Sequence, residues 1–325
     1  MIHPLPSGTR DVLPDEMREL RAITDALRAT FEQHGYGEVR TPAIEYEEVL
    51  RRGGAGPAPA YRVFDDHGEV LSLRSDMTVP IARVAATRYA TAEPPLRFCY
   101  VAHAYRAVRP HRGQMREFLQ AGIELLGAPG PDGTAEALTV LCAALDAVGL
   151  GTARVGLGSA AVYPSLLAAY DVPEPARPRL LDALAEQDFV ALEDTVRGLA
   201  LPAEAVDELV RVPQLRGGAE VLDAVSGPVA DAARGLRRTL DLLEPRVAAR
   251  MIVDLGLARA FGYYTGAVFE VYDPALGAPI GGGGRYDDLV GRFGRSLPAV
   301  GFALTVDQVH IAIAGEERAG RVARA

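Results

Sequence analysis

Long apolar runs are missing from this sequence of 325 residues. A helix that spans a membrane needs about 20 consecutive apolar residues, and no run approaches that length. The first residues, MIHPLPSGTRDVLPDEM, also lack the basic-then-apolar order of a secretory signal peptide. The sequence therefore predicts a cytoplasmic protein without a membrane anchor.

Cysteine and positive charge are scarce as well. The two cysteines, Cys99 and Cys142, lie far apart in apolar patterns, and we expect reduced core residues rather than a disulfide, in keeping with a cytoplasmic location. No Cys and His spacing is typical of a zinc site, so no metal is predicted. A net charge of −9 argues against an extended nucleic-acid-binding surface, although a local basic patch stays compatible with it.

The patterns that are present divide the chain into three parts. Helix and strand patterns are mixed at both ends, whereas the middle is rich in Ala, Leu, Glu, Asp and Arg, with prolines between short helical patterns. We therefore predict an α+β fold with an antiparallel sheet, spanning residues 1–315 and interrupted by a helical insertion at about 163–250. Residues 316–325 are predicted to form a polar, frayed tail.

The first helix is predicted at residues 15–34. Pro14 and the acidic residues after it suit a helix start. Apolar residues then recur every three or four positions: Met17, Leu20, Ile23, Leu27 and Phe31. Such a stripe serves either a core within the chain or a seam between two copies.

The most informative stretch is residues 97–127, which predicts two strands joined by a basic turn. In the second strand the apolar positions are Leu119, Ala121, Ile123 and Leu125, and the positions between them include Gln120, Gly122 and Glu124. Because strand side chains alternate between faces, one face packs on a core and the other presents polar groups. That polar face either lines a cavity or faces solvent, and the pattern does not separate the two.

Three further segments carry polar groups of the same kind. They supply Asp76 and Thr78 after a strand, Arg259 with Tyr263 and Tyr264 before another, and the glycine run 281–284 followed by Arg285. Carboxylates, an arginine and phenols together suit a small zwitterion, which glycine backbone lets approach closely. Each also has a structural alternative: Asp76 as a helix N-cap, Arg259 in a surface ion pair, the tyrosines in the core, and the glycines in a flexible turn.

These segments resemble the class II aminoacyl-tRNA synthetases, most closely the histidyl-tRNA synthetases. GTRDVLP at 8–14 and RTPAIE at 40–45 resemble the first class II motif, and residues 98–127 resemble the second. The sequence from Arg259 to Gly266 and the GGRYD at 283–287 are similar to histidine-type signatures. The resemblance covers about residues 6–160 and 250–313. It implies a class II antiparallel sheet flanked by helices, and a dimer with helix 15–34 at its seam.

The chain departs from the synthetase pattern where ATP chemistry is concerned. Arg106 matches the ATP-binding arginine of the second motif, but Val108 replaces the acid two positions later. In the third motif, Thr305 replaces a glycine and Gln308 stands where an arginine belongs. Losing one preorganised partner of a developing charge typically lowers the rate by about 10²–10³-fold. Asp76-Met77-Thr78 replaces the usual Glu-Gly-Thr, and we expect no anticodon-binding domain.

A kept amino-acid site with a lost ATP site resembles the regulatory subunits of ATP phosphoribosyltransferase. The resemblance implies a non-catalytic subunit that a short catalytic subunit requires, and that mediates histidine feedback inhibition in the first step of L-histidine biosynthesis. It implies L-histidine as the allosteric ligand, no cofactor, no tRNA, and a homodimer within a hetero-oligomer, expected from the family to be a hetero-octamer. The alternative is a truncated histidyl-tRNA synthetase or a synthetase-like ligase.

The resemblance also implies roles for individual residues. Asp76 and Gln120 are expected at the α-ammonium and Arg259 at the carboxylate, while Glu124 and Tyr264 face the imidazole. Thr78 and Tyr263 complete the predicted histidine site, and Arg106, Arg116 and Arg285 are further candidates for pocket or phosphate contacts. The loop 107–115, with Arg109, His111 and Arg112, is either a partner-binding surface or a solvated basic turn.

Overall fold

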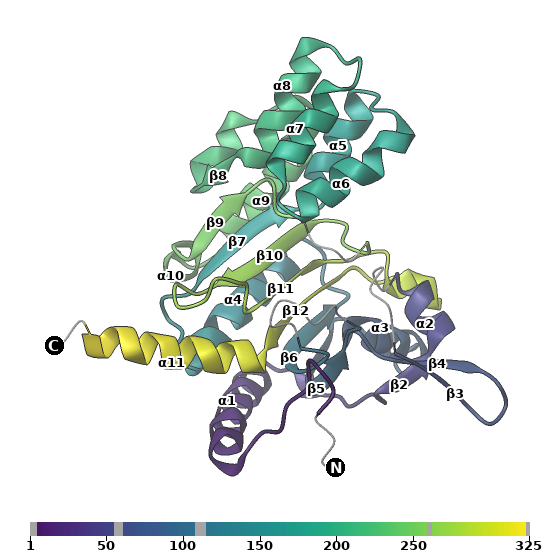
Figure 1. Cartoon of the computed structure of the whole chain (residues 1–325), viewed down its shortest axis with the longest axis vertical. Helices are drawn as coiled ribbons and strands as arrows, with labels where there is room; N and C mark the ends of the chain where they lie inside the picture. The colour runs from purple at the N-terminus through teal and green to yellow at the C-terminus, as the bar shows by residue number, and fades with distance from the viewer. Residues whose placement is uncertain (1–4, 55–60, 108–114, 259–261, 323–325) are drawn as a thin grey trace.

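The computed structural model describes residues 5–54, 61–107, 115–258 and 262–322. A nine-stranded mixed sheet runs through the molecule in the order β1-β5-β6-β12-β11-β10-β7-β9-β8 (Figure 1). In chain order these strands are β1 (Gly37–Glu38), β5 (Leu96–Tyr105), β6 (Glu117–Leu126), β7 (Arg154–Ser159), β8 (Arg216–Gly217), β9 (Met251–Asp254), β10 (Ala267–Tyr272), β11 (Gly281–Arg285) and β12 (Ala299–Thr305). Within it, β1 and β5 pair in parallel, as do β7 and β9, and the other pairs are antiparallel. The predicted α+β fold is confirmed.

Three long helices pack along one part of this sheet: α1 (Pro14–Gln33), α4 (Asp132–Ala147) and α11 (Val306–Val322). Helix α1 begins with Pro14, Asp15 and Glu16, which suit the positive end of the helix dipole. Its residues Leu20, Ile23, Leu27 and Phe31 are buried. Met17 is 40% exposed in the single chain, so the part of the predicted stripe that is buried within this chain begins at Leu20.

A smaller three-stranded sheet has the order β2-β4-β3 and lies away from the helical part of the chain (Figure 1). Its strands are β2 (Ile44–Tyr46), β3 (Arg62–Phe64) and β4 (Val70–Leu73), and the adjoining helices are α2 (Glu47–Arg52) and α3 (Thr78–Thr87). The buried face of α3 joins a second hydrophobic cluster, with Met77, Tyr100, Tyr263 and Tyr286 among its members. This second cluster positions the polar pocket described below.

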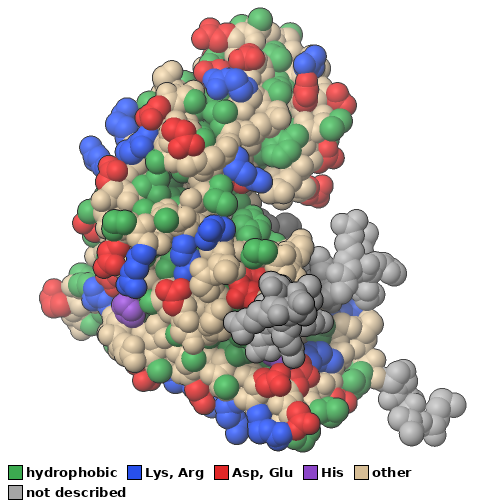
Figure 2. Space-filling view, turned by 90° about the vertical axis from the view of Figure 1, so that its left-hand side faces the viewer, with side chains coloured by type: hydrophobic (Ala, Val, Ile, Leu, Met, Phe, Trp, Pro, Cys, Tyr) green, Lys and Arg blue, Asp and Glu red, His purple; other side chains and the backbone are tan. Residues whose placement is uncertain are grey.

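Residues 162–248 are mainly helical and rise from one end of the sheet (Figure 1). The helices are α5 (Val162–Ala169), α6 (Arg177–Ala185), α7 (Phe189–Arg197), α8 (Ala203–Arg211), α9 (Ala230–Asp241) and α10 (Pro245–Ala248). Their apolar side chains, such as Leu166, Leu192 and Leu236, join the same hydrophobic cluster as α1 and α4. On the face shown in Figure 2, basic and acidic side chains are interspersed over this region and the core.

Two segments bear on alternatives and predictions from the sequence. The glycine run 281–284 is strand β11, which excludes the alternative of a flexible turn, because its backbone pairs with β10 on one side and β12 on the other. The prediction of a frayed tail is wrong as far as Val322, because helix α11 continues that far through a stretch rich in the good helix formers Ala, Glu and Arg. Cys99 and Cys142 are buried and free, as predicted. None of the described helices is long and apolar enough to cross a membrane.

Candidate functional site

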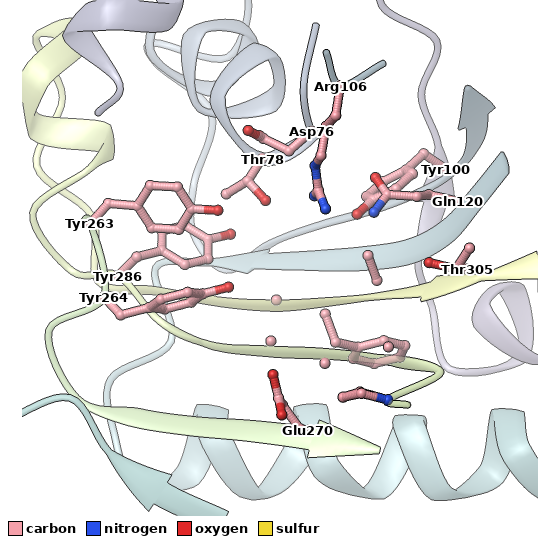
Figure 3. A pocket seen from close by; sticks show the side chains of 17 residues that line it. Asp76, Thr78, Tyr100, Arg106, Gln120, Tyr263, Tyr264, Glu270, Tyr286 and Thr305 are labelled. Atoms are coloured by element: carbon pink, nitrogen blue, oxygen red, sulfur yellow. The ribbon is translucent and has the colours of Figure 1, made fainter. Parts of the chain in front are cut away.

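A polar cavity of about 170 Å³ lies where the central strands meet the segments around α3 and β11 (Figure 3). Its polar lining consists of Asp76, Thr78, Tyr100, Arg106, Gln120, Tyr263, Tyr264, Glu270, Tyr286 and Thr305. Pockets for drug-sized ligands are typically about 300–1,000 Å³. The smaller cavity suits a ligand of amino-acid size.

Glycine backbone forms much of the cavity floor. Gly281, Gly282 and Gly283 of β11 and Gly301 of β12 contribute it. A Cβ atom at Gly283 would lie 2.0 Å from the Gly301 carbonyl oxygen, and one at Gly301 would lie 1.8 Å from Glu124 Oε2. These strands can pair this closely, and the cavity can stay open, only because the side chains are absent.

Three tyrosines form one wall. The ring centroids of Tyr263 and Tyr264 are 4.8 Å apart, and those of Tyr263 and Tyr286 are 5.8 Å apart. Their hydroxyl ends point toward the space that Thr78 and Asp76 approach from α3 (Figure 3). Burial raises the pKa of Tyr263 and of Tyr286 well above the ordinary value. Both therefore present neutral hydroxyls at physiological pH.

Two buried acids flank this wall. Glu124 is 1% exposed and accepts hydrogen bonds from the hydroxyls of Thr78, at 2.7 Å, and of Tyr286. Burial raises the pKa of Glu124 to about 8, which those two hydrogen bonds only partly oppose, and the charge of Asp76 raises it further. Asp76 is 5% exposed, and burial raises its pKa as well. Its carboxylate accepts from the Val79 backbone N–H at 3.0 Å, so Asp76 also caps the start of α3.

The opposite side of the cavity carries a guanidinium and an amide. Arg106 follows β5, and its guanidinium carbon lies 4.9 Å from the centre of the Phe118 ring. Its charge lowers the pKa of Asp76, against the larger effect of burial. The Gln120 amide oxygen is buried without a hydrogen-bond partner among the described residues. A buried acceptor left unpaired costs about 1–3 kcal/mol, so a ligand ammonium that donates to it would be stabilised.

The structure brings together most of the predicted histidine site. Asp76, Thr78, Gln120, Tyr263 and Tyr264 line the cavity directly. Glu124 does not form its surface but lies immediately behind Thr78, Tyr286 and Gly301, which do. Arg259 lies outside the described residues, as does most of the predicted basic loop with Arg109, His111 and Arg112.

The three additional arginines differ in whether they line the cavity. Arg106 lines the cavity, whereas Arg116 and Arg285 do not. Arg285 is 5% exposed, and its guanidinium donates to Thr134, Asp287 and the Ala128 carbonyl. It thus joins β11 to the start of α4 as a structural side chain. The Arg116 backbone N–H donates to Gly8, which ties the N-terminal segment to β6.

Sequence reasoning missed several lining residues. Tyr100 pairs with Gly122 across β5 and β6, so strand alternation places it on the same face as Gln120 and Glu124. In the GGRYD segment the lining residue is Tyr286, whereas the sequence analysis named Arg285 as the candidate. Glu270 on β10 accepts from the Tyr272 hydroxyl at 2.6 Å. Within the described part of the chain, no three His, Cys, Asp or Glu side chains gather to hold a metal ion.

Comparison with known proteins shows the family of this chain. The family model described as histidyl-tRNA synthetase matches residues 8–309. A curated relative from Symbiobacterium thermophilum, named ATP phosphoribosyltransferase regulatory subunit, is 42% identical over 98% of this chain and 81% of its own length. A relative with the same name from Moorella thermoacetica is 41% identical over 95% of this chain and 81% of its own length.

A solved structure agrees with these relatives. A crystal structure from Bacillus halodurans, described as an ATP phosphoribosyltransferase regulatory subunit/histidyl-tRNA synthetase, superposes with a TM-score of 0.89 at 30% identity, covering 96% of this chain and 84% of that one. These matches extend over both the core and the helical part. The chain therefore belongs to the family of ATP phosphoribosyltransferase regulatory subunits, which share the fold of the histidyl-tRNA synthetases.

Proposed function

We propose that this chain is a non-catalytic regulatory subunit that binds L-histidine in the cavity. A short catalytic subunit of ATP phosphoribosyltransferase requires it, and through it histidine inhibits the first step of histidine biosynthesis. The observation that carries the proposal is the cavity itself. It has the size for one amino acid and is lined by acids, an arginine and phenols that match a zwitterion.

Each part of histidine has a partner of suitable chemistry. Asp76 and the unpaired amide oxygen of Gln120 suit the α-ammonium. Arg259 is the expected partner of the carboxylate. The imidazole is assigned to the tyrosine wall, with Tyr264 on the cavity surface and Glu124 behind Thr78. No metal or cofactor takes part in this proposal.

Loss of synthetase chemistry is supported by the junction of β12 and α11. Thr305 lines the cavity, and the first turn of α11 carries Asp307 and Gln308 instead of an arginine. Asp307 pairs with Arg10 at 2.6 Å. A neutral amide cannot hold the phosphate charge that develops during amino-acid activation.

Inhibition requires that histidine binds two states of the complex with different affinity. A typical allosteric coupling of about 1–3 kcal/mol corresponds to an affinity difference of about 5–150-fold. The cavity lies among β5, β6, β11 and β12 and touches segments from both ends of the chain.

A homodimer within the hetero-oligomer is part of the proposal. The resemblance places helix α1 at its seam, and the small sheet offers a second exposed apolar surface that would extend the seam. Register places Tyr46, Leu71 and Val63 side by side on one face. Tyr46 is 52% exposed and Val63 is 41% exposed. Adjacent exposed apolar side chains of this kind favour a contact with another chain.

A matched pair of variants tests this dimer. Phe64, 72% exposed, pairs with Val70 and points to the opposite face of the same sheet. Tyr46→Glu should convert the dimer to a monomer in sedimentation analysis, whereas Phe64→Glu should not. A dimer that survives Tyr46→Glu would exclude this face.

The decisive experiment is co-purification with a short catalytic subunit, followed by activity with and without histidine. We expect the catalytic subunit to need this chain and to lose activity when histidine is added. Catalysis that is unaffected by this chain would refute the regulatory role. Calorimetry with Glu124→Ala and Arg259→Ala tests the pocket separately, and unchanged histidine affinity in both would exclude it.

The synthetase alternative has one observation in its favour. Arg106, which matches the ATP-binding arginine, lines the cavity. Histidine-dependent exchange of pyrophosphate into ATP by the purified chain would establish that activity. We expect none, because the third-motif arginine is replaced by Gln308.

A further inference from the structure

A second cavity lies where the helical part of the chain meets the large sheet. Its volume is about 360 Å³, which falls in the usual range of about 300–1,000 Å³ for small-molecule sites. Both parts of the chain line it. The insertion contributes Tyr163, Leu181 and Leu184, and the segments beside β9 and β10 contribute Leu255, Leu257 and Tyr264.

The described lining of this second cavity is mainly apolar. Leu184, Leu255 and Leu257 are buried there, and Leu181 is partly exposed at the surface. An ionised ligand would have to leave water for an apolar surface, which is costly unless its charge is paired. Two tyrosine rings also line the cavity, and aromatic rings gain from packing on one another beyond the area that they bury. An uncharged aromatic ring therefore suits this lining.

One polar group inside this apolar lining has an unused hydrogen-bonding capacity. The hydroxyl of Tyr163 has no hydrogen-bond partner among the described residues, although the side chain is only 2% exposed. Burial raises the pKa of Tyr163, so the hydroxyl keeps its proton at physiological pH. Buried tyrosine hydroxyls usually have a partner, and an unpaired one is costly. A ligand oxygen that pairs with it would remove that cost.

We propose that the second cavity is a ligand site for a small uncharged aromatic molecule with one hydroxyl or carbonyl oxygen. The ring packs among the leucines and tyrosines, and the ligand oxygen pairs with the Tyr163 hydroxyl. The site is separate from the histidine cavity but shares one side chain with it, because Tyr264 lines both cavities.

The shared tyrosine links the two sites. A ligand in the second cavity packs against Tyr264 from the side of the helical insertion and holds the wall of the histidine cavity in place. Resting on the proposed function, the inference is that an occupant of the second cavity strengthens histidine binding. The linkage is reciprocal, so histidine strengthens binding of the aromatic ligand by the same factor.

Fluorine NMR titration of the full chain with 4-fluorophenol and with fluorobenzene tests the site itself. The two probes have the same ring, and only the first carries a hydroxyl. Tyr163→Phe should lower the affinity for 4-fluorophenol by about 5–10-fold and leave that for fluorobenzene unchanged. An equal change for both probes would overturn the pairing with Tyr163. Failure of both probes to bind the wild-type chain at millimolar concentration would overturn the site.

A matched pair of variants locates the probes. Ala185 in α6 lines the second cavity and is exposed, whereas Ala168 in α5 is exposed and does not line it. Ala185→Trp should fill the cavity and abolish binding of both probes, and Ala168→Trp should leave binding unchanged. Probes that bind Ala185→Trp as well as the wild type would place them elsewhere and refute the proposal.

Calorimetry of L-histidine binding, with and without excess 4-fluorophenol, tests the linkage. We expect histidine to bind about fivefold more tightly when 4-fluorophenol is present, and we expect no change in Ala185→Trp. An unchanged or weaker histidine affinity in the wild type would refute the linkage through Tyr264. Histidine that fails to bind the wild-type chain at all would instead refute the proposed function, while the fluorine titrations would still decide the second site.

Discussion

Replacing Glu124 by Gln should stabilise the ligand-free protein in a strongly pH-dependent way. Gln resembles the protonated carboxyl in shape and cannot ionise. In the folded protein burial raises the Glu124 pKa from 4.5 to about 8. Between these values the folded state binds more protons than the unfolded state, so wild-type stability falls as pH rises. The variant lacks that loss.

The magnitude follows from the same pKa values. The pKa rises from 4.5 to about 8 on folding. At 1.36 kcal/mol per pKa unit, the wild type loses about 5 kcal/mol of unfolding free energy, relative to the variant, once the pH exceeds both values. Near pH 5 the variant and the wild type should have similar free energies of unfolding. The advantage of the variant should then grow by up to about 1.4 kcal/mol per pH unit and level off above pH 8.

Urea unfolding followed by circular dichroism, at pH values from 5 to 9, measures this difference. Glu136 offers a matched control. Burial raises its pKa, but the hydrogen bonds from Arg97 and Tyr36, with the charge of Arg97, outweigh burial and lower it. A group with a lowered folded pKa loses its stabilisation only as the pH falls through that pKa, so the effect of Glu136→Gln should be constant from pH 5 to 9. A Glu124→Gln effect that is equally constant would show that folded Glu124 is ionised throughout, and would refute the reasoning.

Three further predictions concern stability and packing. Gly301→Ala should abolish histidine binding in calorimetry, because its Cβ would lie 1.8 Å from Glu124 Oε2. In contrast, a Cβ at Gly235 in α9 meets nothing within 4 Å, so Gly235→Ala should raise the urea midpoint and increase the free energy of unfolding by about 0.5–1 kcal/mol. Arg250→Ala should cost about 3–5 kcal/mol in urea unfolding, because its buried guanidinium satisfies Asp146 and three backbone carbonyls. The exposed Arg246→Ala should cost under about 1 kcal/mol, and equal losses for the two arginines would contradict this account.

The sequence by itself determined features that depend on local periodicity. Alternation along β6 placed Gln120 and Glu124 on one face, and the spacing of Leu20, Ile23, Leu27 and Phe31 defined the buried side of α1. These follow from the fixed repeats of strands and helices, which the chain carries wherever it packs. The mixture of such segments was enough for the α+β class.

Only the tertiary structure decided which polar groups meet. Gly281–Gly284 became a strand because two neighbouring strands satisfy its backbone, and Arg285 became structural because Thr134 and Ala128 lie within its reach. Tyr286 belongs to the site because its hydroxyl donates a hydrogen bond to Glu124, which is 162 positions away in the sequence. Burial by distant segments, rather than any neighbour in the chain, is what raises the Glu124 pKa. The strand pattern could place Glu124 on the polar face of β6, but its burial behind the cavity and its raised pKa depend on which segments enclose it.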